Sequence, residues 1–386
     1  MDAFPKTLFF EVAHRFGGSG TRLIVLMKNL PKDRIALACL SSSETANALR
    51  PLGYTIYEIG NNKFDPMIPV RVAKILNEEK FEVFDTQNIQ SKILGSIVVK
   101  LNPVTFVSTV NSTYMKEYGD NIKGRLYHLL DIFTNRNLDH IVAVSAEVQT
   151  MLVDAGVDQD QISLIRNSVD VTNEEVIPDP DWLKKSFNIP SESQVGVAIG
   201  RLEWVKGFDV LISAMKIITA KVPNFHCLIV GDGPQRQKLE EMSSEYGVDN
   251  HIIFAGFQPL SNVYNLLKSS DMMIMPSRSE GTPMALLEAA SFSSAIIASN
   301  VGGIPDVVSD GSEAVLVPPE DAKSLADGIV LLCKDSSLKN RLGIAARARV
   351  KSAFAPAAQV QALAAAYQNA LNHFSQSKPG IGTSKT

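Results

Sequence analysis

Two carboxylates flank the predicted start of a helix in the second half of the chain. The apolar run Met272–Met275 predicts a short buried strand, and Ser-Arg-Ser-Glu-Gly-Thr-Pro follows it one residue later. Thr282 and Pro283 are residue types typical of the Ncap and N1 positions, so we expect a helix to begin there. Glu280 would then stand just before the helix. Glu288 would lie about 9 Å along the helix axis from the cap.

These residue types suit a phosphorylated sugar. A helix N-terminus presents free N–H groups and a partial positive charge, which favours a phosphate group. Carboxylates accept hydrogen bonds from hydroxyl groups, so Glu280 and Glu288 would suit the hydroxyls of a sugar and of a ribose. Taken alone, both glutamates are also compatible with ordinary surface acids.

Two cations precede this region, in the loop Gly200–Gly207 that follows another predicted strand. Arg201 offers a planar fork of donors for phosphate oxygens, and Lys206 offers a compact charge. Most arginines and lysines are solvated surface residues. The position at the carboxyl end of a strand, with flanking glycines, favours a diphosphate site.

Glycine-rich turns occur at three further places. Gly17 and Gly18 belong to a Gly-Gly-Ser-Gly run after the first predicted strand, where the backbone could approach a phosphate or simply form a tight turn. Asp232, in Gly-Asp-Gly-Pro, is better explained as a turn residue. Gly302 and Gly303 indicate a backbone role near the same site.

The elements that would position these residues alternate between strand and helix, which predicts parallel sheets covered on both faces. In such sheets ligands bind beyond the carboxyl ends of the strands. We expect two doubly wound α/β domains facing a cleft, separated by a proline-rich and acidic linker within 167–190. The predicted domains are residues 1–172, joined by a C-terminal helix at 356–374, and residues 173–355, with a disordered tail at 375–386.

Composition limits the classes of function. The chain has 386 residues, a formal net charge of −4 and three widely spaced cysteines, which argues against a general nucleic-acid binder, a zinc site or a disulfide framework. The sequence contains no apolar run long enough to span a bilayer, so we expect a cytoplasmic protein. Residues 91–136 contain an excess of basic residues, which could contact the inner face of a membrane or simply form a solvated surface. These residues are Lys92, Lys100, Lys116, Lys123, Arg125 and Arg136.

Four motifs occur in a fixed order in the second half: G-R-L-x-x-x-K-G, G-D-G-P, E-G-x-P-x-x-x-L-E and G-G-x-P-D. As a set they resemble the family-4 type of retaining glycosyltransferases, which have the GT-B fold. The resemblance covers most of the second half, and the first half agrees in pattern and in its glycine turn.

The resemblance implies roles for individual residues. Arg201 and Lys206 would bind the diphosphate of a nucleotide-sugar, Glu280 the sugar hydroxyls and Glu288 the ribose. Backbone contacts to the sugar and phosphate would come from Gly281, Thr282, Pro283, Gly17 and Gly18. No metal or cofactor is implied, and UDP is the commonest nucleotide in the family.

The first half departs from the family pattern on the acceptor side. Many relatives have a histidine where this chain has Asn111, and often histidines near the position of Asn88. A smaller departure is Ser168, where relatives commonly have glycine. An amide can hydrogen-bond a hydroxyl but cannot act as a general base.

The predicted reaction does not need such a base. In the front-face mechanism usually given for the family, the leaving phosphate oxygen assists the acceptor proton. We therefore expect transfer of a hexosyl group to a glycan or lipid-linked hydroxyl in polysaccharide, lipopolysaccharide or glycolipid synthesis. Two alternatives remain: a nucleotide-sugar epimerase or hydrolase, and a non-catalytic nucleotide-sugar-binding partner.

Overall fold

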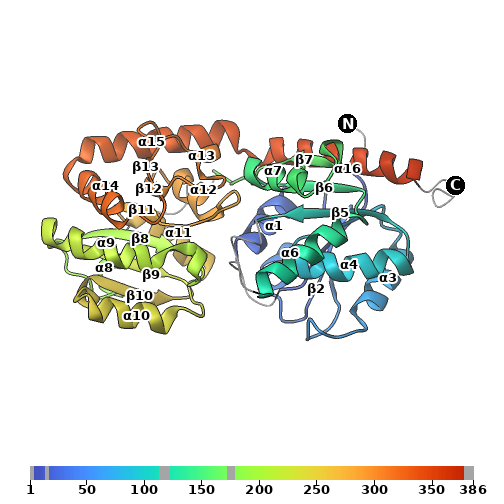
Figure 1. Cartoon of the computed structure of the whole chain (residues 1–386), viewed down its shortest axis with the longest axis horizontal. Coiled ribbons are helices and arrows are strands. Elements are labelled where there is room, and N and C mark those ends of the chain that lie inside the picture. The colour runs from blue at the N-terminus through green and yellow to red at the C-terminus, as the bar shows by residue number, and fades with distance from the viewer. Residues whose placement is uncertain (1–3, 14–16, 113–121, 172–178, 378–386) are drawn as a thin grey trace. The chain divides into compact units, whose positions relative to one another are not determined.

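The computed structural model describes residues 4–13, 17–112, 122–171 and 179–377, without the side chains of 122–128. The chain divides into two compact units (Figure 1). Unit 1 comprises Met1–Ser168 and Pro356–Thr386, and unit 2 comprises Val169–Ala355. The division falls after Ser168, a few residues before the boundary expected from the sequence. Each unit is described by itself below.

Unit 1 contains a parallel seven-stranded sheet in the order β3-β2-β1-β4-β5-β6-β7 among the described residues. Its strands are β1 (Thr7–Glu11), β2 (Ile35–Cys39), β3 (Thr55–Glu58), β4 (Val83–Thr86), β5 (Thr105–Val110), β6 (His140–Ala143) and β7 (Ile162–Leu164). Its α-helices are α1 (Gly18–Lys28), α2 (Glu44–Leu49), α3 (Ile68–Glu79), α4 (Ile89–Leu101), α6 (Ile122–Asn135), α7 (Ala146–Asp154) and α16 (Pro356–Ser377), with short 3₁₀ turns η1 (Arg50–Leu52) and η2 (Gln159–Gln161).

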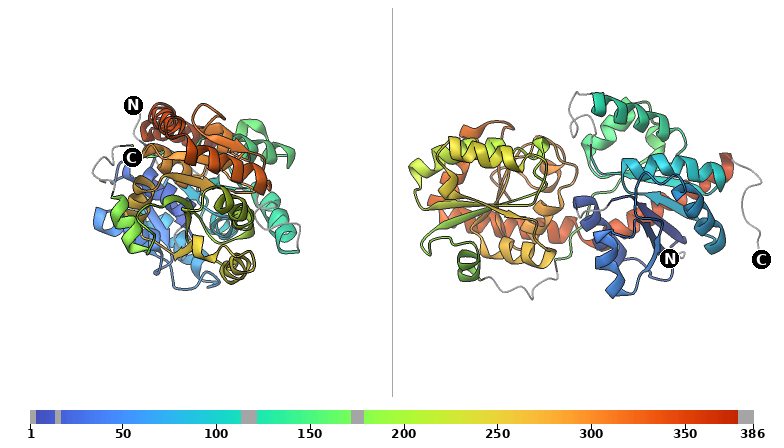
Figure 2. Two further views of the ribbon diagram at one scale, coloured as in Figure 1. Left: turned by 90° about the vertical axis from the view of Figure 1, so that its left-hand side faces the viewer. Right: turned by 90° about the horizontal axis from the view of Figure 1, so that it is seen from below.

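Helices cover both faces of this sheet. Successive side chains of a strand point to opposite faces, so neighbouring apolar residues pack against different helices. Leu8 and Phe10 of β1 belong to one core cluster, which includes residues of α3, α4 and α7. Phe9, between them, belongs to a second cluster with residues of α1, α2 and α16. The views in Figure 2 show helices on either side of the strands. Unit 1 is therefore doubly wound, as predicted.

Helix α16 belongs to unit 1 although it ends the described chain. It packs on β5, β6 and α1 (Figure 1). The hydroxyl of its buried Tyr367 donates a hydrogen bond of 2.6 Å to Asp85 of β4, and the hydroxyl of Ser168 donates one of 2.7 Å to Gln359. Burial raises the pKa of Asp85 to about 6. The serine that departs from the family pattern thus forms part of the junction with α16.

Unit 2 contains a parallel six-stranded sheet in the order β10-β9-β8-β11-β12-β13 in its described part. Its strands are β8 (Gln194–Ile199), β9 (Phe225–Val230), β10 (Ile252–Gly256), β11 (Met272–Met275), β12 (Ala295–Ser299) and β13 (Val315–Val317). Its α-helices are α8 (Pro180–Ser186), α9 (Phe208–Lys221), α10 (Arg236–Glu245), α11 (Leu260–Ser269), α12 (Met284–Ser291), α13 (Ile304–Val307), α14 (Ala322–Lys334) and α15 (Ser336–Ala353), with 3₁₀ turns η3 (Trp204–Lys206) and η4 (Asp249–His251).

Two segments differ from the sequence-based prediction. The predicted linker contains helix α8, whose Leu183 is fully buried and whose Asp179 side chain accepts from the backbone N–H of Trp182 at 2.8 Å. Asp179-Pro180 supplies an N-cap followed by a proline at N1, which starts a helix. The tail predicted as disordered from residue 375 is helical as far as Ser377, and its remainder lies outside the described residues.

No helix in the described part of the chain has the length and apolar character needed to cross a lipid bilayer.

Candidate functional site

The predicted residues of unit 2 lie on loops at one edge of its sheet. Strands β9, β8, β11 and β12 are consecutive neighbours, so the loops after them meet at their carboxyl ends. The loop after β8 carries Arg201 and Lys206, and the loop after β11 carries Glu280. Glu288 lies on α12, which follows that second loop.

Two glycines lock these loops together. Gly207 has a φ of +66°, and a Cβ there would lie 2.0 Å from the carbonyl oxygen of Pro276. Gly302 has a φ of +56°, and a Cβ there would lie 2.0 Å from the carbonyl oxygen of Glu280. The backbone N–H of Gly303 donates to that same oxygen at 3.1 Å. Only glycine combines this conformation with so close an approach, so Gly207 holds the backbone at Pro276 and Gly302 holds it at Glu280.

Lys206 and Glu280 come together, although 74 positions separate them in the chain. The Lys206 ammonium donates to Oε1 of Glu280 at 2.7 Å, and the hydroxyl of Ser277 donates to the same oxygen at 2.7 Å. The side chain of Glu280 is nearly buried, and that of Lys206 is about a quarter exposed. The pair is therefore held in place and remains partly accessible. Ser277 was not among the predicted site residues.

Glu288 is a buried acid with an unsatisfied oxygen. It is 5% exposed, and its Oε1 has no hydrogen-bond partner. Burial raises the pKa of Glu288 to about 8, so the carboxyl group is mostly protonated at neutral pH. A buried polar atom without a partner is unfavourable unless a ligand or water satisfies it. This geometry suits an acid that accepts hydrogen bonds from a bound molecule.

The start of α12 differs by one position from the prediction. Pro283 is the N-cap, with a ψ of 118°, and its carbonyl accepts the first helical hydrogen bond, from Leu287 at 3.2 Å. Thr282 therefore precedes the cap. Gly281 and Thr282 are buried and form part of the chain that leads into the helix.

Arg201 is the most exposed of the predicted residues in unit 2. Its side chain is 60% exposed and forms an ion pair with Glu203 at 2.7 Å. An exposed pair of this kind contributes little stability, so the guanidinium can exchange its partner at low cost. Asp232 accepts a hydrogen bond from the N–H of Gly233 at 2.8 Å, which fits the turn role expected for it.

In unit 1, Gly17 is the N-cap of α1 and Gly18 begins that helix. Gly17 has an extended φ of −157°, and neither glycine is in the left-handed region. A Cβ at either position would meet nothing within 4 Å. The turn conformation therefore does not require these glycines, and the protein around them leaves open space.

The two asparagines predicted for the acceptor side lie near each other in unit 1. Asn111 donates from Nδ2 to the carbonyl oxygen of Gln87 at 2.8 Å. Asn88, the next residue after Gln87, caps α4 by accepting from the N–H of Ser91 at 2.8 Å. Their local bonds fix both side chains at the carboxyl end of β4 and β5.

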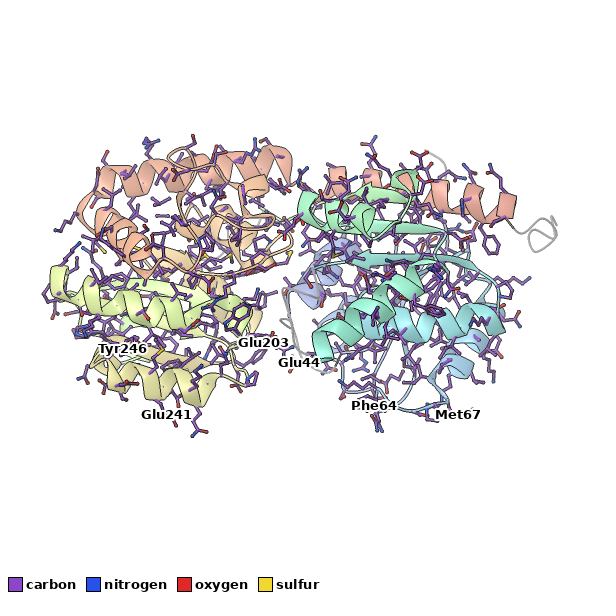
Figure 3. All side chains as sticks on the ribbon, viewed as in Figure 1. Glu44, Phe64, Met67, Glu203, Glu241 and Tyr246 are labelled. Carbon is purple, nitrogen blue, oxygen red and sulfur yellow. The ribbon has the colours of Figure 1, made fainter. Side chains whose placement is uncertain are left out.

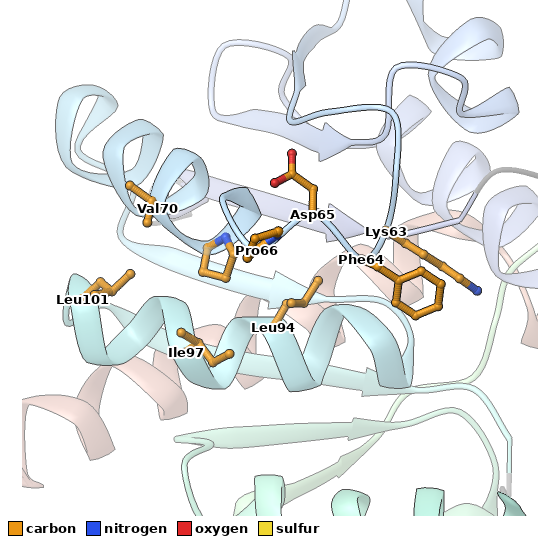
Figure 4. Close-up of a pocket in the computed structure, with 9 residues that line it drawn as sticks. Lys63, Phe64, Asp65, Pro66, Val70, Leu94, Ile97 and Leu101 are labelled. Atoms are coloured by element: carbon orange, nitrogen blue, oxygen red, sulfur yellow. The ribbon is translucent and has the colours of Figure 1, made fainter.

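An apolar pocket lies elsewhere in unit 1, between α3 and α4 (Figure 4). Its volume is about 370 Å³. Apolar residues form most of its lining, which is Lys63, Phe64, Asp65, Pro66, Pro69, Val70, Leu94, Ile97 and Leu101. None of the predicted site residues lines it.

Two doubly wound domains of parallel strands in one chain define the GT-B class of proteins. The family model of group 1 glycosyl transferases matches residues 181–349, and the model of glycosyltransferase family 4 matches residues 16–173. The two models together cover most of both units. The chain belongs to the group 1 and family 4 type of glycosyltransferases.

Individual relatives agree with this assignment. The chain is 26% identical over 275 residues to the UDP-Gal:alpha-D-GlcNAc-diphosphoundecaprenol alpha-1,3-galactosyltransferase of Escherichia coli, covering 70% of each chain. It is 26% identical over 242 residues to the 2-deoxystreptamine glucosyltransferase of Streptomyces kanamyceticus, covering 61% of this chain and 62% of that protein. Its fold is similar to that of Anabaena Alr3699/HepE in complex with UDP and glucose, with a TM-score of 0.82 and 20% identity over 94% of this chain and 99% of the other.

Proposed function

We propose that this glycosyltransferase moves a hexosyl group, with retention of configuration, from a nucleoside-diphosphate sugar to a hydroxyl acceptor. UDP is the first choice of nucleotide, because a similarly folded protein was solved with UDP and glucose. A glycan or lipid-linked acceptor in cell-envelope polysaccharide or glycolipid synthesis fits the name of the E. coli relative, a galactosyltransferase whose acceptor is a sugar on diphosphoundecaprenol.

The observation that carries this proposal is the set of charges around α12. The Lys206–Glu280 pair stands on loops locked by glycine, and the unsatisfied Glu288 lies along the helix that follows. A diphosphate would take Lys206 as its counter-ion, while sugar hydroxyls would donate to Glu280. Ribose hydroxyls would satisfy Glu288. Each group of the donor would thus meet a partner of suitable chemistry.

In the proposed step, the bond between the anomeric carbon and the phosphate oxygen breaks, and its electron pair stays on that oxygen. The acceptor hydroxyl oxygen forms the new bond on the same face of the sugar, and its proton passes to the leaving phosphate oxygen. Arg201, Lys206 and the N–H groups at the start of α12 would stabilise the charge that develops there. No side chain has to remove the acceptor proton.

Unit 1 would supply the acceptor side. The open space beyond Gly17 and Gly18 would admit a phosphate or sugar close to the backbone. Asn88 and Asn111 would contribute hydrogen bonds and no proton transfer.

No resident cofactor or metal is part of this proposal, and the nucleotide-sugar serves as a substrate. Within the described residues, no group of three His, Cys, Asp or Glu side chains is arranged to hold a metal ion.

The two alternatives can be separated from transfer by simple assays. A nucleotide-sugar epimerase or hydrolase would convert the donor rapidly in the absence of any acceptor. A non-catalytic binder would retain donor affinity without turnover on any acceptor. The Lys206–Glu280 pair supports an enzyme over a non-catalytic binder, because a leaving diphosphate would need a cation beside it.

We expect a nucleotide-sugar to raise the melting temperature of the protein, with UDP-sugars giving the largest shift. A ligand at about a hundred times its Kd stabilises the folded state by about 2.7 kcal/mol. Differential scanning fluorimetry with UDP-, GDP- and ADP-sugars measures this effect. The Lys206→Ala variant is the matched control and should show a smaller shift. Absence of a shift with every nucleotide-sugar would contradict the proposed function.

Peripheral contact with an anionic lipid bilayer is a further part of the proposal, and the apolar pocket of unit 1 supports it. Phe64 is 79% exposed and is labelled in Figure 3 with Met67, which is also exposed. Val70, Ile97 and Leu101, which line the same pocket as Phe64, are also exposed (Figure 4). Such clustered apolar exposure is unusual for a surface that faces only water.

The charges around this pocket suit anionic lipid. Lys63 lies over the ring of Phe64 at 5.2 Å, and Lys100 is exposed next to Leu101. The acid in the lining, Asp65, is paired with Arg71 at 2.6 Å. Of these four charged side chains, three are cationic and one is anionic.

The basic surface predicted from the sequence needs one correction. Lys92 is fully buried and forms an ion pair with Asp131 of α6, with a further hydrogen bond of 2.7 Å to Asn135. It cannot contact a membrane. Lys100 and Arg136 are exposed. The other cations of that prediction, Lys116, Lys123 and Arg125, have side chains outside the described residues.

We expect the protein to sediment with vesicles that contain anionic lipid, and the double variant Phe64→Asn/Met67→Asn to remain in the supernatant. Both side chains are exposed, so the substitutions should leave the fold intact. Ile344→Asn, at an exposed apolar residue of α15, is the matched control and should bind like the wild type. Equal sedimentation of the double variant and the wild type would exclude this surface, and binding to neutral vesicles alone would exclude the electrostatic contribution.

A further inference from the structure

Arg278 joins the loop after β11 to the segment that carries Lys206. Its side chain is only 9% exposed. Nη1 donates to the carbonyl oxygen of Trp204 at 2.6 Å and to Oδ1 of Asp209 at 2.8 Å, while Nη2 donates to Oδ2 of Asp209 at 2.7 Å. Nε donates to Glu320 at 2.9 Å. Four hydrogen bonds within the protein therefore engage this guanidinium.

The same arginine packs against the loop in two other ways. The carbon of its guanidinium lies 4.6 Å from the ring centre of Trp204, as in a cation–π contact. Its backbone N–H donates to the carbonyl oxygen of Val205 at 2.7 Å. Arg278 thus binds both of the residues that precede Lys206 in turn η3.

Arg278 also contacts the chain on the C-terminal side of Lys206, through Asp209. It lies in the first turn of α9, which begins directly after Gly207. The bidentate pair with Arg278 therefore fixes the chain three residues after the lysine, while Trp204 and Val205 fix it before. A single 3₁₀ turn has poor hydrogen-bond geometry of its own, so external contacts decide where its side chains point.

Glu320, which accepts from Nε of Arg278, has an unusual backbone conformation. It has a φ of +62°, a left-handed conformation that residues with a Cβ rarely adopt. Its side chain is 63% exposed, and an exposed ion pair alone gives little stability in return. Strained residues of this kind concentrate at functional sites.

We propose that Arg278 is a positioning residue that holds turn η3 so that Lys206 meets the diphosphate of the donor. Arg278 itself would not touch the donor, since its side chain is 9% exposed and four of its five N–H groups are engaged by Trp204, Asp209 and Glu320. The inference rests on the proposed function and adds to it the residue that orients the cation.

The test measures the affinity of purified variants for UDP by calorimetry, with GDP and ADP as further probes. Arg278→Lys keeps a positive charge but cannot form the bidentate pair with Asp209 and also reach Trp204 and Glu320. We expect it to weaken nucleotide binding about tenfold and to lower kcat by roughly a hundredfold through misplacement of Lys206. In a Lys206→Ala background, Arg278→Lys should weaken binding no further. Equal effects in both backgrounds would overturn the positioning role.

Glu320→Gly separates positioning from folding. Glycine adopts a φ of +62° without strain, so this variant should melt at or above the wild-type temperature while it binds UDP more weakly. Unchanged UDP affinity in this variant would overturn the proposal. Asp327→Asn, which removes an exposed ion pair with Lys221 in the same unit, is the matched control. If the wild type neither binds UDP nor transfers a sugar, the proposed function fails; if the wild type does both and the Arg278 and Glu320 variants behave like it, the positioning role alone fails.

Discussion

Replacement of Lys206 by alanine is expected to lower the rate of sugar transfer by about a hundred- to a thousandfold, the range found when one preorganised donor to a developing negative charge is removed. The ammonium lies 2.7 Å from Glu280 on a turn held by Gly207 and Arg278, so little reorganisation is needed for it to meet a leaving diphosphate. The measurement is kcat with saturating donor and acceptor.

The matched control is Lys221→Ala, at a lysine of the same unit whose exposed ion pair is with Asp327. It should react like the wild type. A Lys206→Ala enzyme with nearly normal kcat would mean that this lysine does not stabilise the transition state.

Glu288→Gln is expected to have opposite effects on nucleotide binding and on stability. Ribose hydroxyls donate to a carboxylate more strongly than to an amide, so UDP affinity should fall about tenfold to a hundredfold. Binding to the carboxylate favours its ionised form, and donor binding should therefore release a proton. Wild-type affinity should rise with pH until about pH 8, the pKa of the buried acid, and the variant should lose this dependence.

In the absence of nucleotide, Glu288→Gln should increase the stability of the protein at high pH. Burial raises the pKa of Glu288 from 4.5 to about 8, so the folded state holds a proton that the unfolded state releases. This contribution to stability is fully present below pH 4.5 and is lost as the pH rises through about 8. We expect Glu288→Gln to melt at a higher temperature than the wild type at pH 9 and at a similar temperature at pH 5. A lower melting temperature at pH 9 would show that the carboxylate has a structural partner.

Much of the fold could be predicted from the sequence because parallel strands buried on both faces are short apolar runs. The predicted strand at Met272–Met275 matches the observed strand β11 residue for residue. Helix α8 was missed because its prolines and acids resemble a linker, although Asp179-Pro180 is itself a helix-start signal. The cap of α12 was misplaced by one residue because threonine is the stronger capping type.

The candidate site could be predicted only as a set of residue types. The motif order identified Lys206, Glu280 and Glu288, but no local pattern shows that the first two form an ion pair or that the third is buried without a partner. Arg278 carries no local signal either, since its partners Asp209 and Glu320 are distant in sequence and only the folded sheet edge brings them together. Lys92 was misassigned to the surface for the same reason, because Asp131 follows it 39 residues later.

The position of α16 has a consequence for the order in which the chain folds during synthesis. Its Leu363, Tyr367 and Ala370 complete one core cluster of unit 1, and Tyr367 satisfies the buried Asp85. Unit 2 is continuous from Val169 to Ala355, and its two ends are joined by a hydrogen bond of 3.1 Å between Val169 N–H and the Phe354 carbonyl. During synthesis, the strands of unit 1 emerge before α16 and lack part of their core until that helix follows. Unit 2 is continuous in sequence, so its core needs no later segment. The domain that is translated first is therefore finished last.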